Sequence, residues 1–490
     1  MRVIETYEVE AENVKVKVKI SGEDDKALKY ELFVPVIAPA TSALLDEIRH
    51  ELITEVVVST AEILDPKVIE NIKARFHERA EKILTRKLVK IDSETKNFLV
   101  GTLIRDMLGL GKMEFLLNDP YLEEIVVTSA FEPIRIYHKR HGWLETNIKI
   151  ESEDQIQNYA NIIARRVGRQ ITTLSPLLDA HLITGDRSNA VLYPVSVKGN
   201  TLTIRKFARD PWTITDFIEN KTINSSLAAL IWLAVQYEMN VLISGGTASG
   251  KTSLLNVIMP FIPPNQRIIT IEQTRELQLP KFLFWCPLVT RLANPEGKGG
   301  VDMLDLLVNS LRMRPDRIIL GEVRTSEEAA VLFEAMHTGH SVYATVHADS
   351  VPETITRLTN PPISVPANMM QAVNLNLVMF RDRRKGIRRV YQTGEFLVGD
   401  EGGRSTVRPN LLYRWKPVED VIIQHSKSSK LFDDLSRFTG MSMQEINNDL
   451  AEKKKILEYM VKKKIRYIDD VGKIMNDYYV NPGALLKSLK

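Results

Sequence analysis

One octapeptide restricts the fold of this chain more than any other feature of its sequence. Residues 245–252 read Gly-Gly-Thr-Ala-Ser-Gly-Lys-Thr and match the pattern G-x-x-x-x-G-K-[ST] in full. The apolar run Val241-Leu242-Ile243 precedes the octapeptide, and a helical pattern that starts at Thr252 follows it. A strand, a glycine-rich loop and a helix in this order predict a phosphate-binding loop in an α/β domain. A glycine-rich turn without this role is the less favoured alternative.

The residue types of the loop each have a chemical reason. Glycines let backbone N–H groups curl around phosphate oxygens without a Cβ in the way, and the following helix points its positive end at the same anion. Lys251 is expected to reach the β- and γ-phosphates, and Thr252 to hold Mg²⁺. ATP and Mg²⁺ are therefore the expected ligands. The residues predicted to bind them are Gly245, Gly246, Thr247, Ala248, Ser249, Gly250, Lys251, Thr252 and Ser253.

Composition narrows the class of protein further. The chain has 490 residues, which corresponds to roughly three domains. Its net charge of +3 argues against a protein that coats a polyanion. The single cysteine, Cys286, excludes an internal disulfide and a four-cysteine zinc site. Neither an export signal nor an 18-residue apolar run is visible, so a cytoplasmic protein is expected.

Changes in residue composition and hydrophobic periodicity divide the chain into four segments. Residues 1–100 form an N-terminal α+β region, and residues 101–212 form a second α/β domain. Residues 213–425 alternate short apolar strands with helices, as a parallel sheet requires, and residues 426–490 form a charged helical tail. The fold class is therefore α/β. Two local predictions are a hairpin of strands 191–194 and 201–204 with a Gly-Asn turn, and a linker over 210–226.

An acidic residue follows one of the predicted strands of the third segment. Glu322 lies just after the apolar run 317–320. The carboxyl ends of parallel strands face the ligand crevice, so Glu322 is expected near the phosphate loop. There it can orient or deprotonate the attacking water, or act on Mg²⁺ through water, and we assign it as the principal catalytic acid. A solvated acid at a strand end is the alternative.

Further candidates lie at the ends of two other predicted strands. Glu272 and Glu276 follow the strand 267–271, and His340 and His347 flank the strand 341–346. The spacing of the two histidines does not match a common zinc pair. We expect them to act as hydrogen-bonding sensors of phosphate or of a neighbouring domain, with a structural role as the alternative.

The motifs resemble those of the secretion ATPases of the type II and type IV pilus superfamily, and they occur in the same order. In the terms of that family, the segments are Walker A (Gly245–Thr252), the Asp box (Glu272–Glu276), Walker B (Leu311–Arg324) and the His box (Thr338–Ala348). Four upstream segments also resemble the family's second N-terminal domain: Gly168-Arg169, Asp179-Ala180, Gly185–Arg187 and Leu202–Phe207. The tail Leu450–Tyr479 resembles the archaeal branch.

The resemblance implies a RecA-like P-loop NTPase core preceded by a PAS-like domain, assembled as a homohexamer. ATP would bind between subunits and between the two domains. Arg187 and Arg205 match family arginines that supply positive charge to a neighbour's phosphates, for which a planar guanidinium is suited. A surface ion pair is the alternative for each arginine. Gln273 departs from the family, which has an aspartate there; an amide can position water but cannot act as a base.

These features lead to a functional hypothesis. The chain is expected to hydrolyse ATP to ADP and phosphate at the inner face of the cell membrane. Turnover would drive a polytopic membrane platform protein, and through it pilin-like subunits, to assemble a type IV pilus-like filament or to support type II-like secretion. An archaellum motor and a nucleic-acid motor of the conjugation type are alternatives. A non-catalytic nucleotide-binding scaffold is a third, supported only by Gln273.

Basic clusters leave the nature of the contact surface open. Three segments are rich in positive charge: Arg381–Arg389, Lys453–Lys455 and Lys462–Lys464. A solvated surface, or a face turned to acidic loops or anionic lipid headgroups, accounts for them. The clusters lack interleaved aromatic residues for base stacking, so no nucleic-acid partner is expected.

Overall fold

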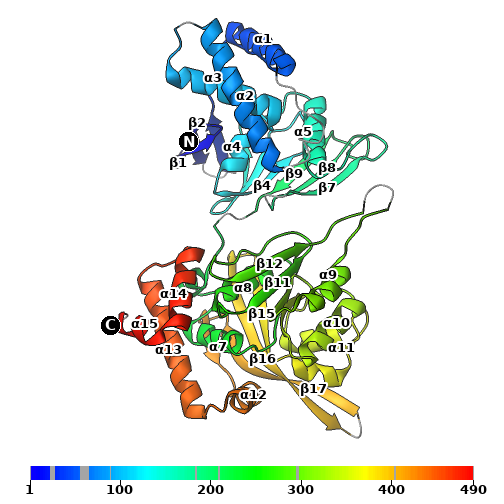
Figure 1. Ribbon diagram of the computed structural model, residues 1–490, viewed down its shortest axis with the longest axis vertical. Helices are drawn as coiled ribbons and strands as arrows, with labels where there is room; N and C mark the ends of the chain where they lie inside the picture. The colour runs from blue at the N-terminus through cyan, green and yellow to red at the C-terminus, as the bar shows by residue number, and fades with distance from the viewer. Residues whose placement is uncertain are drawn as a thin grey trace. The chain divides into compact units, whose positions relative to one another are not determined.

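The computed structural model describes residues 2–22, 28–55, 66–88, 90–182, 185–207, 210–293, 297–401 and 404–488. The chain divides into two compact units, Met1–Arg209 and Asp210–Lys490 (Figure 1). Helices and strands mix in both units, which confirms the predicted α/β class. None of the helices in these ranges is long and apolar enough to cross a bilayer.

The described part of the first unit is built on one sheet with the strand order β1-β2-β3-β6-β5-β4-β9-β8-β7. Its strands are β1 (Arg2–Ala11), β2 (Val14–Gly22), β3 (Lys29–Phe33), β4 (Leu122–Val127), β5 (Arg135–His138), β6 (Gly142–Thr146), β7 (Leu177–His181), β8 (Arg187–Val191) and β9 (Thr201–Arg205). Valines and lysines alternate in β2, and the valines are buried while most of the lysines are exposed, because successive side chains of a strand point to opposite faces.

The helices of the first unit fall into two groups. They are α1 (Pro39–Glu55), α2 (Pro66–Lys87), α3 (Ser93–Leu108), α4 (Met113–Asn118) and α5 (Glu153–Arg166). The first three share a small apolar core of their own, whereas α4 and α5 contribute to the core of the sheet. The helix α5 begins where its sequence predicts, because the Ser152 side chain accepts a hydrogen bond from the Gln155 N–H.

Two local predictions are corrected. The predicted hairpin is confirmed in its pairing, because β8 and β9 are antiparallel partners, but its first strand spans Arg187–Val191 instead of 191–194. The expected linker 210–226 contains the helix α6 (Ile214–Glu219). The Asp216 carboxylate accepts a 2.9 Å hydrogen bond from the Thr213 N–H at the start of this helix, a capping arrangement that the polar composition of the segment concealed.

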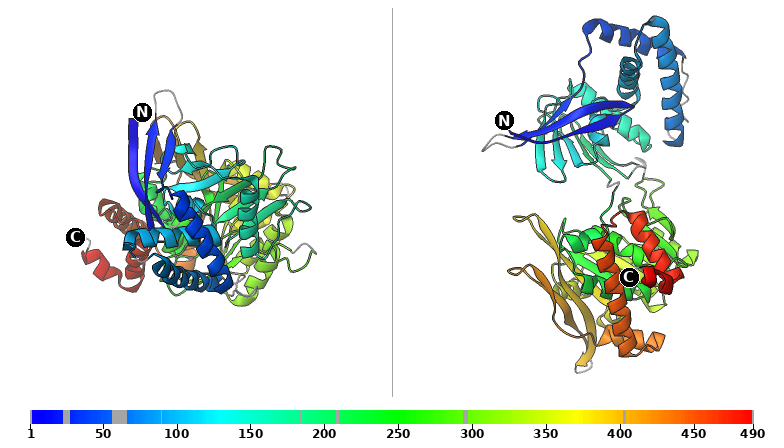
Figure 2. Two further views of the ribbon diagram at one scale, coloured as in Figure 1. Left: turned by 90° about the horizontal axis from the view of Figure 1, so that it is seen from above. Right: turned by 90° about the vertical axis from the view of Figure 1, so that its left-hand side faces the viewer.

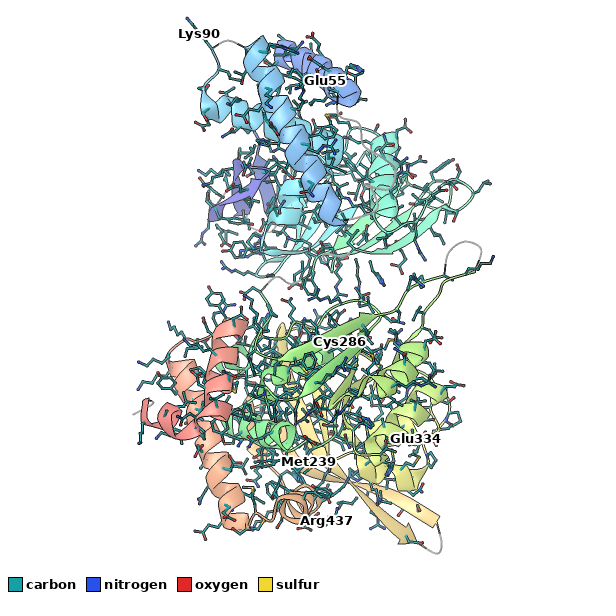
Figure 3. The ribbon with its side chains drawn as sticks, in the orientation of Figure 1. Glu55, Lys90, Met239, Cys286, Glu334 and Arg437 are labelled. Carbon is teal, nitrogen blue, oxygen red and sulfur yellow. The ribbon has the colours of Figure 1, made fainter. Side chains whose placement is uncertain are left out.

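The second unit contains a sheet with the order β12-β11-β13-β14-β10-β15-β16-β17-β18. Its described strands are β10 (Val241–Gly245), β11 (Arg267–Glu272), β12 (Phe284–Val289), β13 (Arg317–Leu320), β14 (Ser341–Val346), β15 (Leu375–Asp382), β16 (Ile387–Glu401), β17 (Arg404–Lys416) and β18 (Val421–Gln424). The pairs from β12 to β15 are parallel, and the pairs from β15 to β18 are antiparallel. The four strands predicted for residues 241–346 are confirmed, and Cys286 lies on β12 (Figure 3).

Helices cover this sheet and extend to the end of the chain. They are α7 (Ser225–Gln236), α8 (Lys251–Ile258), α9 (Met303–Ser310), α10 (Ser326–His337), α11 (Val351–Thr359), α12 (Lys430–Thr439), α13 (Met443–Lys462), α14 (Ile468–Val480) and α15 (Pro482–Ser488). The tail helices α13 and α14 pack against α7 (Figure 1), and Figure 2 shows the tail beside the same unit. Trp232 of α7 stacks on Phe261 at 5.3 Å between ring centroids and donates a 2.9 Å hydrogen bond to the Tyr479 hydroxyl of α14. The tail therefore shares one core with the rest of the second unit.

Candidate functional site

The parallel strands of the second unit bring the candidate residues to one edge of the sheet. The strands β10, β11, β13 and β14 all run in the same direction, so their carboxyl ends meet there. Gly245 ends β10, Glu272 ends β11, Glu322 follows β13 and His347 follows β14. Residues that are up to about 100 positions apart in the sequence are thus assembled by the topology alone.

The phosphate loop leads directly from β10 into α8. Gly250 adopts a φ of +100° immediately before Lys251, the first residue of α8, and only glycine tolerates this conformation without strain. The Lys251 ammonium donates to the carbonyl oxygens of Gly245 at 2.9 Å and Gly246 at 3.1 Å. Burial lowers the pKa of Lys251, while the nearby carboxylates of Glu322 and Asp349 oppose that shift.

A series of side-chain contacts links Lys251 to Glu322, the acidic residue that follows β13. The Lys251 Nζ lies 3.4 Å from the Nδ1 of His347, and the His347 Nε2 lies 2.8 Å from the Oε1 of Glu322. An ammonium can only donate, so Nδ1 accepts from Lys251 and Nε2–H donates to Glu322. The structure therefore brings together Lys251, His347 and Glu322, three of the residues singled out from the sequence.

Arg324 extends this chain of contacts to the Asp-box position. Its Nε donates to the Oε2 of Glu322 at 2.8 Å, and its Nη1 donates to the Oε1 of Gln273 at 2.8 Å. Both oxygens of Glu322 thus have partners, one imidazole and one guanidinium. An arginine can bridge two acceptors in this way because its planar fork presents several N–H groups at once. Gln273 is held in the site through its amide oxygen.

Glu272 is in a different environment. Its side chain is 2% exposed, and its Oε1 accepts hydrogen bonds from the backbone N–H groups of Glu276 and Leu277 at 2.9 and 3.1 Å. Its Oε2 is buried without a hydrogen-bond partner. Burial raises the pKa of Glu272 to about 7, although the two backbone hydrogen bonds act in the opposite direction. This carboxyl holds the loop that follows β11.

His340 does not join the residues at this edge. It precedes β14, whereas His347 follows β14, and six strand residues separate the two by roughly 20 Å. The His340 Nδ1 lies 3.3 Å from the Thr338 hydroxyl at the end of α10. A role for His340 at the phosphate loop of its own chain has no support in this geometry.

Arg187 and Arg205 belong to the first unit. Arg187 begins β8 and Arg205 ends β9, and the antiparallel register places the two directly opposite each other. Arg187 is half-buried and Arg205 is exposed. Two guanidinium groups on neighbouring strands concentrate positive charge at one position of this sheet.

Three residues near the phosphate loop were not selected from the sequence. Arg324 is one of them. Asp349 follows the His box, and a Cβ on Gly246 would lie 2.9 Å from its Oδ1, so the loop and this carboxylate are in close contact. The Arg388 Nε donates to the carbonyl oxygen of Ala248 at 3.2 Å. Arg388 lies in the basic cluster 381–389. The sequence predicts a solvated surface or a contact surface for this cluster, because no local pattern shows that β16 passes the loop.

The donors at this edge fit a nucleoside triphosphate with its magnesium ion. The loop offers a helix N-terminus and an ammonium group, both of which attract anions. The Thr252 hydroxyl lies in the first turn of α8, and Glu322 lies within reach of Lys251 through a single imidazole. Hydroxyl and carboxylate oxygens are the ligands that Mg²⁺ prefers.

The sequence matches one described protein family. The family "Type II/IV secretion system protein" matches residues 110–384. Among curated relatives, the uncharacterized protein MJ0900 of Methanocaldococcus jannaschii is 38% identical over 385 residues, which cover 77% of this chain and 69% of the relative. The type IV secretion system protein PtlH of Bordetella pertussis is 32% identical over 282 residues, covering 51% of this chain and 83% of PtlH.

Solved structures provide one further comparison. The VirB11 ATPase from the Brucella suis type IV secretion system is 24% identical, with 56% of this chain and 90% of VirB11 covered and a TM-score of 0.29.

Proposed function

This chain belongs to the type II/IV secretion system protein family, and from that premise we propose that it is an ATPase that powers assembly of a type IV pilus-like filament or type II-like secretion. The proposed form is a homohexamer at the cytoplasmic face of the membrane, where it acts on a polytopic membrane platform protein and moves pilin-like subunits indirectly. A PAS-like domain over residues 101–212 and a RecA-like ATPase domain over residues 213–425 are part of this proposal. The N-terminal α+β region 1–100 precedes them, and the helical tail 426–490 follows them.

One observation carries the proposal. The Lys251 ammonium, the His347 imidazole and the Glu322 carboxylate form a continuous series of contacts at the phosphate loop, with 3.4 and 2.8 Å between successive partners. Lys251 in such a position can exchange its loop carbonyls for phosphate oxygens. The movement of Lys251 is then transmitted to His347, and through it to Glu322. In this proposal Glu322 accepts a proton from the water molecule that attacks the γ-phosphate.

Further residues support Lys251, His347 and Glu322. Thr252 and, through water, Glu322 would hold Mg²⁺, which neutralises charge on the phosphates. Arg324 keeps Glu322 oriented and ties it to Gln273, so Gln273 acts as a positioning residue. Glu272 shapes the loop that carries Glu276 through backbone hydrogen bonds. Arg187 and Arg205 supply positive charge to the nucleotide of a neighbouring subunit, as the family resemblance implies.

The test of this proposal is nucleotide turnover by a Lys251→Ala variant. Removal of the ammonium group takes away the charge that meets the phosphates, so phosphate release from ATP should fall by at least about 100-fold. Lys385→Ala, an exposed lysine in the turn between β15 and β16, is the matched control and should retain turnover. Wild-type turnover in Lys251→Ala, with the control equally active, excludes this site as the ATPase centre.

Type IV secretion relatives such as PtlH support a second candidate, a motor that serves a secretion channel. A nucleic-acid motor of the conjugation type can be distinguished from a filament or protein-secretion motor by experiment. DNA should stimulate its ATP hydrolysis, and this stimulation should depend strongly on salt. Turnover that is indifferent to added DNA supports the filament or protein-secretion assignment.

A further inference from the structure

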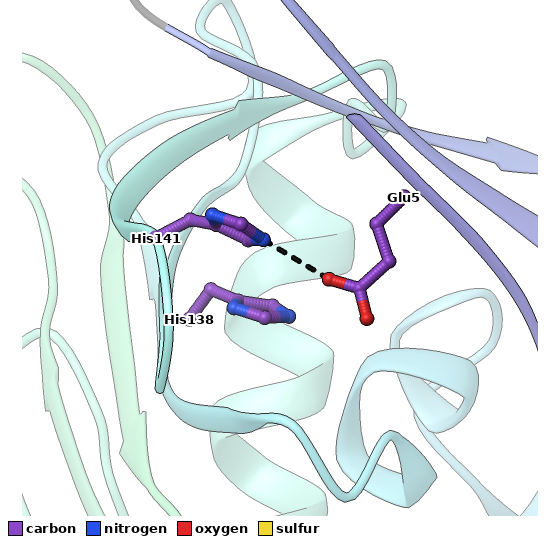
Figure 4. Close-up of side chains that lie close together, drawn as sticks. All are labelled: Glu5, His138 and His141. Atoms are coloured by element: carbon purple, nitrogen blue, oxygen red, sulfur yellow. Dashed lines mark hydrogen bonds and ion pairs between the residues drawn. The ribbon is translucent and has the colours of Figure 1, made fainter. Parts of the chain in front are cut away.

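A second group of metal-ligating side chains lies in the first unit. Glu5 comes from β1, His138 ends β5 and His141 lies in the turn that leads to β6 (Figure 4). Their candidate ligand atoms all lie within 4.8 Å of one another, and the His141 Nε2 is 3.0 Å from the Glu5 Oε2. We propose that Glu5, His138 and His141 form a Zn²⁺ site that fastens β1 to the turn between β5 and β6.

The donor set favours zinc. Two imidazole nitrogens and one carboxylate oxygen are a known set of protein ligands for Zn²⁺, with a fourth position left for water. Bonds of about 2.0–2.2 Å in a tetrahedron place ligand atoms about 3.4 Å apart. The His141 Nε2 and the Glu5 Oε2, at 3.0 Å, are close to this spacing, and the His138 ligand atom lies within 4.8 Å of both, so modest side-chain movements would bring all three to it.

His138 supplies an independent reason to expect a ligand here. Its side chain is fully buried, and its Nε2 has no hydrogen-bond partner. Figure 4 shows this nitrogen directed toward the Glu5 carboxylate. A buried polar atom without a partner is uncommon in folded proteins, and a bound ligand would give this one a partner. Tyr121 and His141 stack against the His138 ring, with interplanar angles of 27° and 28°, which holds the ring in this orientation.

Arg140 prepares the carboxylate and sets the condition for binding. Its Nη1 donates to the Glu5 Oε1 at 2.7 Å, which orients the carboxylate and leaves Oε2 toward the histidines. Its backbone N–H donates to the His138 Nδ1 at 3.1 Å, which places the proton of the neutral ring on Nε2. Zinc binding at Nε2 requires that proton to move to Nδ1, so the Arg140 N–H must give up its hydrogen bond to the ring.

The position of the site indicates what the cation would do. The strand β1 is the terminal strand in the order of this sheet and pairs only with β2 among the described strands. Glu5 reaches a turn about 135 residues further along the chain, where it contacts Arg140 and His141. A metal bond at this point would add a strong cross-link between the N-terminal hairpin and the strands β5 and β6.

The experiment measures binding of Zn²⁺ alone to the full chain, stripped of metal by a chelator and free of nucleotide. We expect one tightly bound Zn²⁺ per wild-type chain, with affinity reduced by about tenfold or more in Glu5→Gln and His141→Asn. His138→Asn should also lose the ion, but it removes a fully buried ring, so the other two variants carry the test if it fails to fold.

Two matched controls locate the binding. His425→Asn changes an exposed histidine of the second unit and should bind Zn²⁺ as the wild type does. His347→Asn removes the imidazole beside Glu322 and should also retain the tightly bound ion. This result would show that the ion is not bound at the phosphate-loop edge of the second unit's sheet. Tight binding that is unchanged in Glu5→Gln and His141→Asn, or its absence from the wild type, overturns the proposal.

Hydrogen exchange of β1 provides a readout specific to the proposed clamp. Added Zn²⁺ should slow amide exchange in residues 2–11 of the wild type and leave exchange in Glu5→Gln unchanged. Zn²⁺ that binds the wild type without any effect on this strand contradicts the proposed clamp.

Discussion

Glu272 combines deep burial with a carboxyl group that is satisfied on one oxygen only. Its Oε1 accepts two backbone hydrogen bonds, whereas its Oε2 has no partner and no solvent contact. Burial raises its pKa to about 7, so the folded chain holds a proton there that the unfolded chain has already lost above its ordinary pKa of 4.5. The protonated form therefore stabilises the folded state, and this contribution is fully present below pH 4.5.

The consequence is a loss of stability as pH rises from about 4.5 to 7. The full effect is about 3.5 kcal/mol at most, because each unit of pKa shift corresponds to about 1.4 kcal/mol. Glu272→Gln keeps the shape but cannot titrate, so the fall in unfolding free energy across this range should be smaller by about that amount. Urea unfolding of the nucleotide-free chain at pH 5 and pH 8 measures this difference.

Glu334→Gln, an exposed position on α10, is the matched control and should keep the wild-type pH dependence. An identical pH dependence in wild type and Glu272→Gln would show that Glu272 is not protonated in the folded chain.

At this scale, the sequence predicts residues that lie within continuous motifs. Lys251, Glu322 and His347 could be selected because strand-end positions and loop patterns are local properties, and the structure brings these three side chains together. Arg388 was not selected, because its partner Ala248 lies about 140 positions away. Arg324 has a partner nearby in Glu322, but its bridge to Gln273 spans about 50 positions and could not be foreseen. No local pattern records contacts of that kind.

Among the elements, β14 shows how a strand separates two residues of one motif. His340 and His347 belong to the same family motif, but they flank opposite ends of the strand. Short apolar runs predicted the strands β10, β11, β13 and β14 well, because buried parallel strands are apolar on both faces. The helix α6 was missed, because its segment is short and polar and its cap depends on Asp216.

The tail helices illustrate packing that composition alone conceals. Charged residues dominate the sequence of α13, yet Ile456, Leu457 and Met460 are fully buried in the core that also contains Trp232. An apolar stripe on one face is sufficient to bury a helix, while most of the charged residues occupy the other face. Lys453 is buried with the stripe: its ammonium lies over the Trp232 and Tyr478 rings and pairs with Asp449, so the basic cluster Lys453–Lys455 is not entirely a solvated surface. The tail is therefore expected to contribute to the stability of the second unit.

Met460→Ala tests this contribution. Truncation of a fully buried methionine removes apolar contacts and leaves a cavity, so the unit should lose about 2–5 kcal/mol of unfolding free energy. Val480→Ala, at a site 72% exposed on α14, should change it by less than about 0.5 kcal/mol. Chemical denaturation followed by tryptophan fluorescence compares the two. Equal stability of Met460→Ala and wild type would contradict the shared core.

For the whole molecule, the proposed ring requires residues of the first unit to act on a neighbour's nucleotide. Arg205→Ala and Lys251→Ala should each abolish turnover alone. In co-assembled mixtures at equal ratio, about a quarter of the sites would combine an intact phosphate loop with an intact arginine from the next chain, and activity should return in proportion.

The size of the mixed assemblies is the control for that experiment, because both variants must be present in the same ring. Inactive mixed hexamers would contradict action on the neighbour and favour an arginine that serves its own chain. Arg187→Ala should behave in the same way as Arg205→Ala, because the two arginines lie opposite each other on β8 and β9.

The central claim is that ATP is hydrolysed at the phosphate loop with Glu322 as the group that activates water. Comparing Glu322→Gln with wild type for both ATP binding and phosphate release tests this claim most directly. Glutamine keeps the size of the side chain and can still bond to Arg324, but it cannot accept the proton. We predict ATP affinity within about threefold of wild type and phosphate release slower by at least about 100-fold. Wild-type phosphate release from Glu322→Gln would contradict the account.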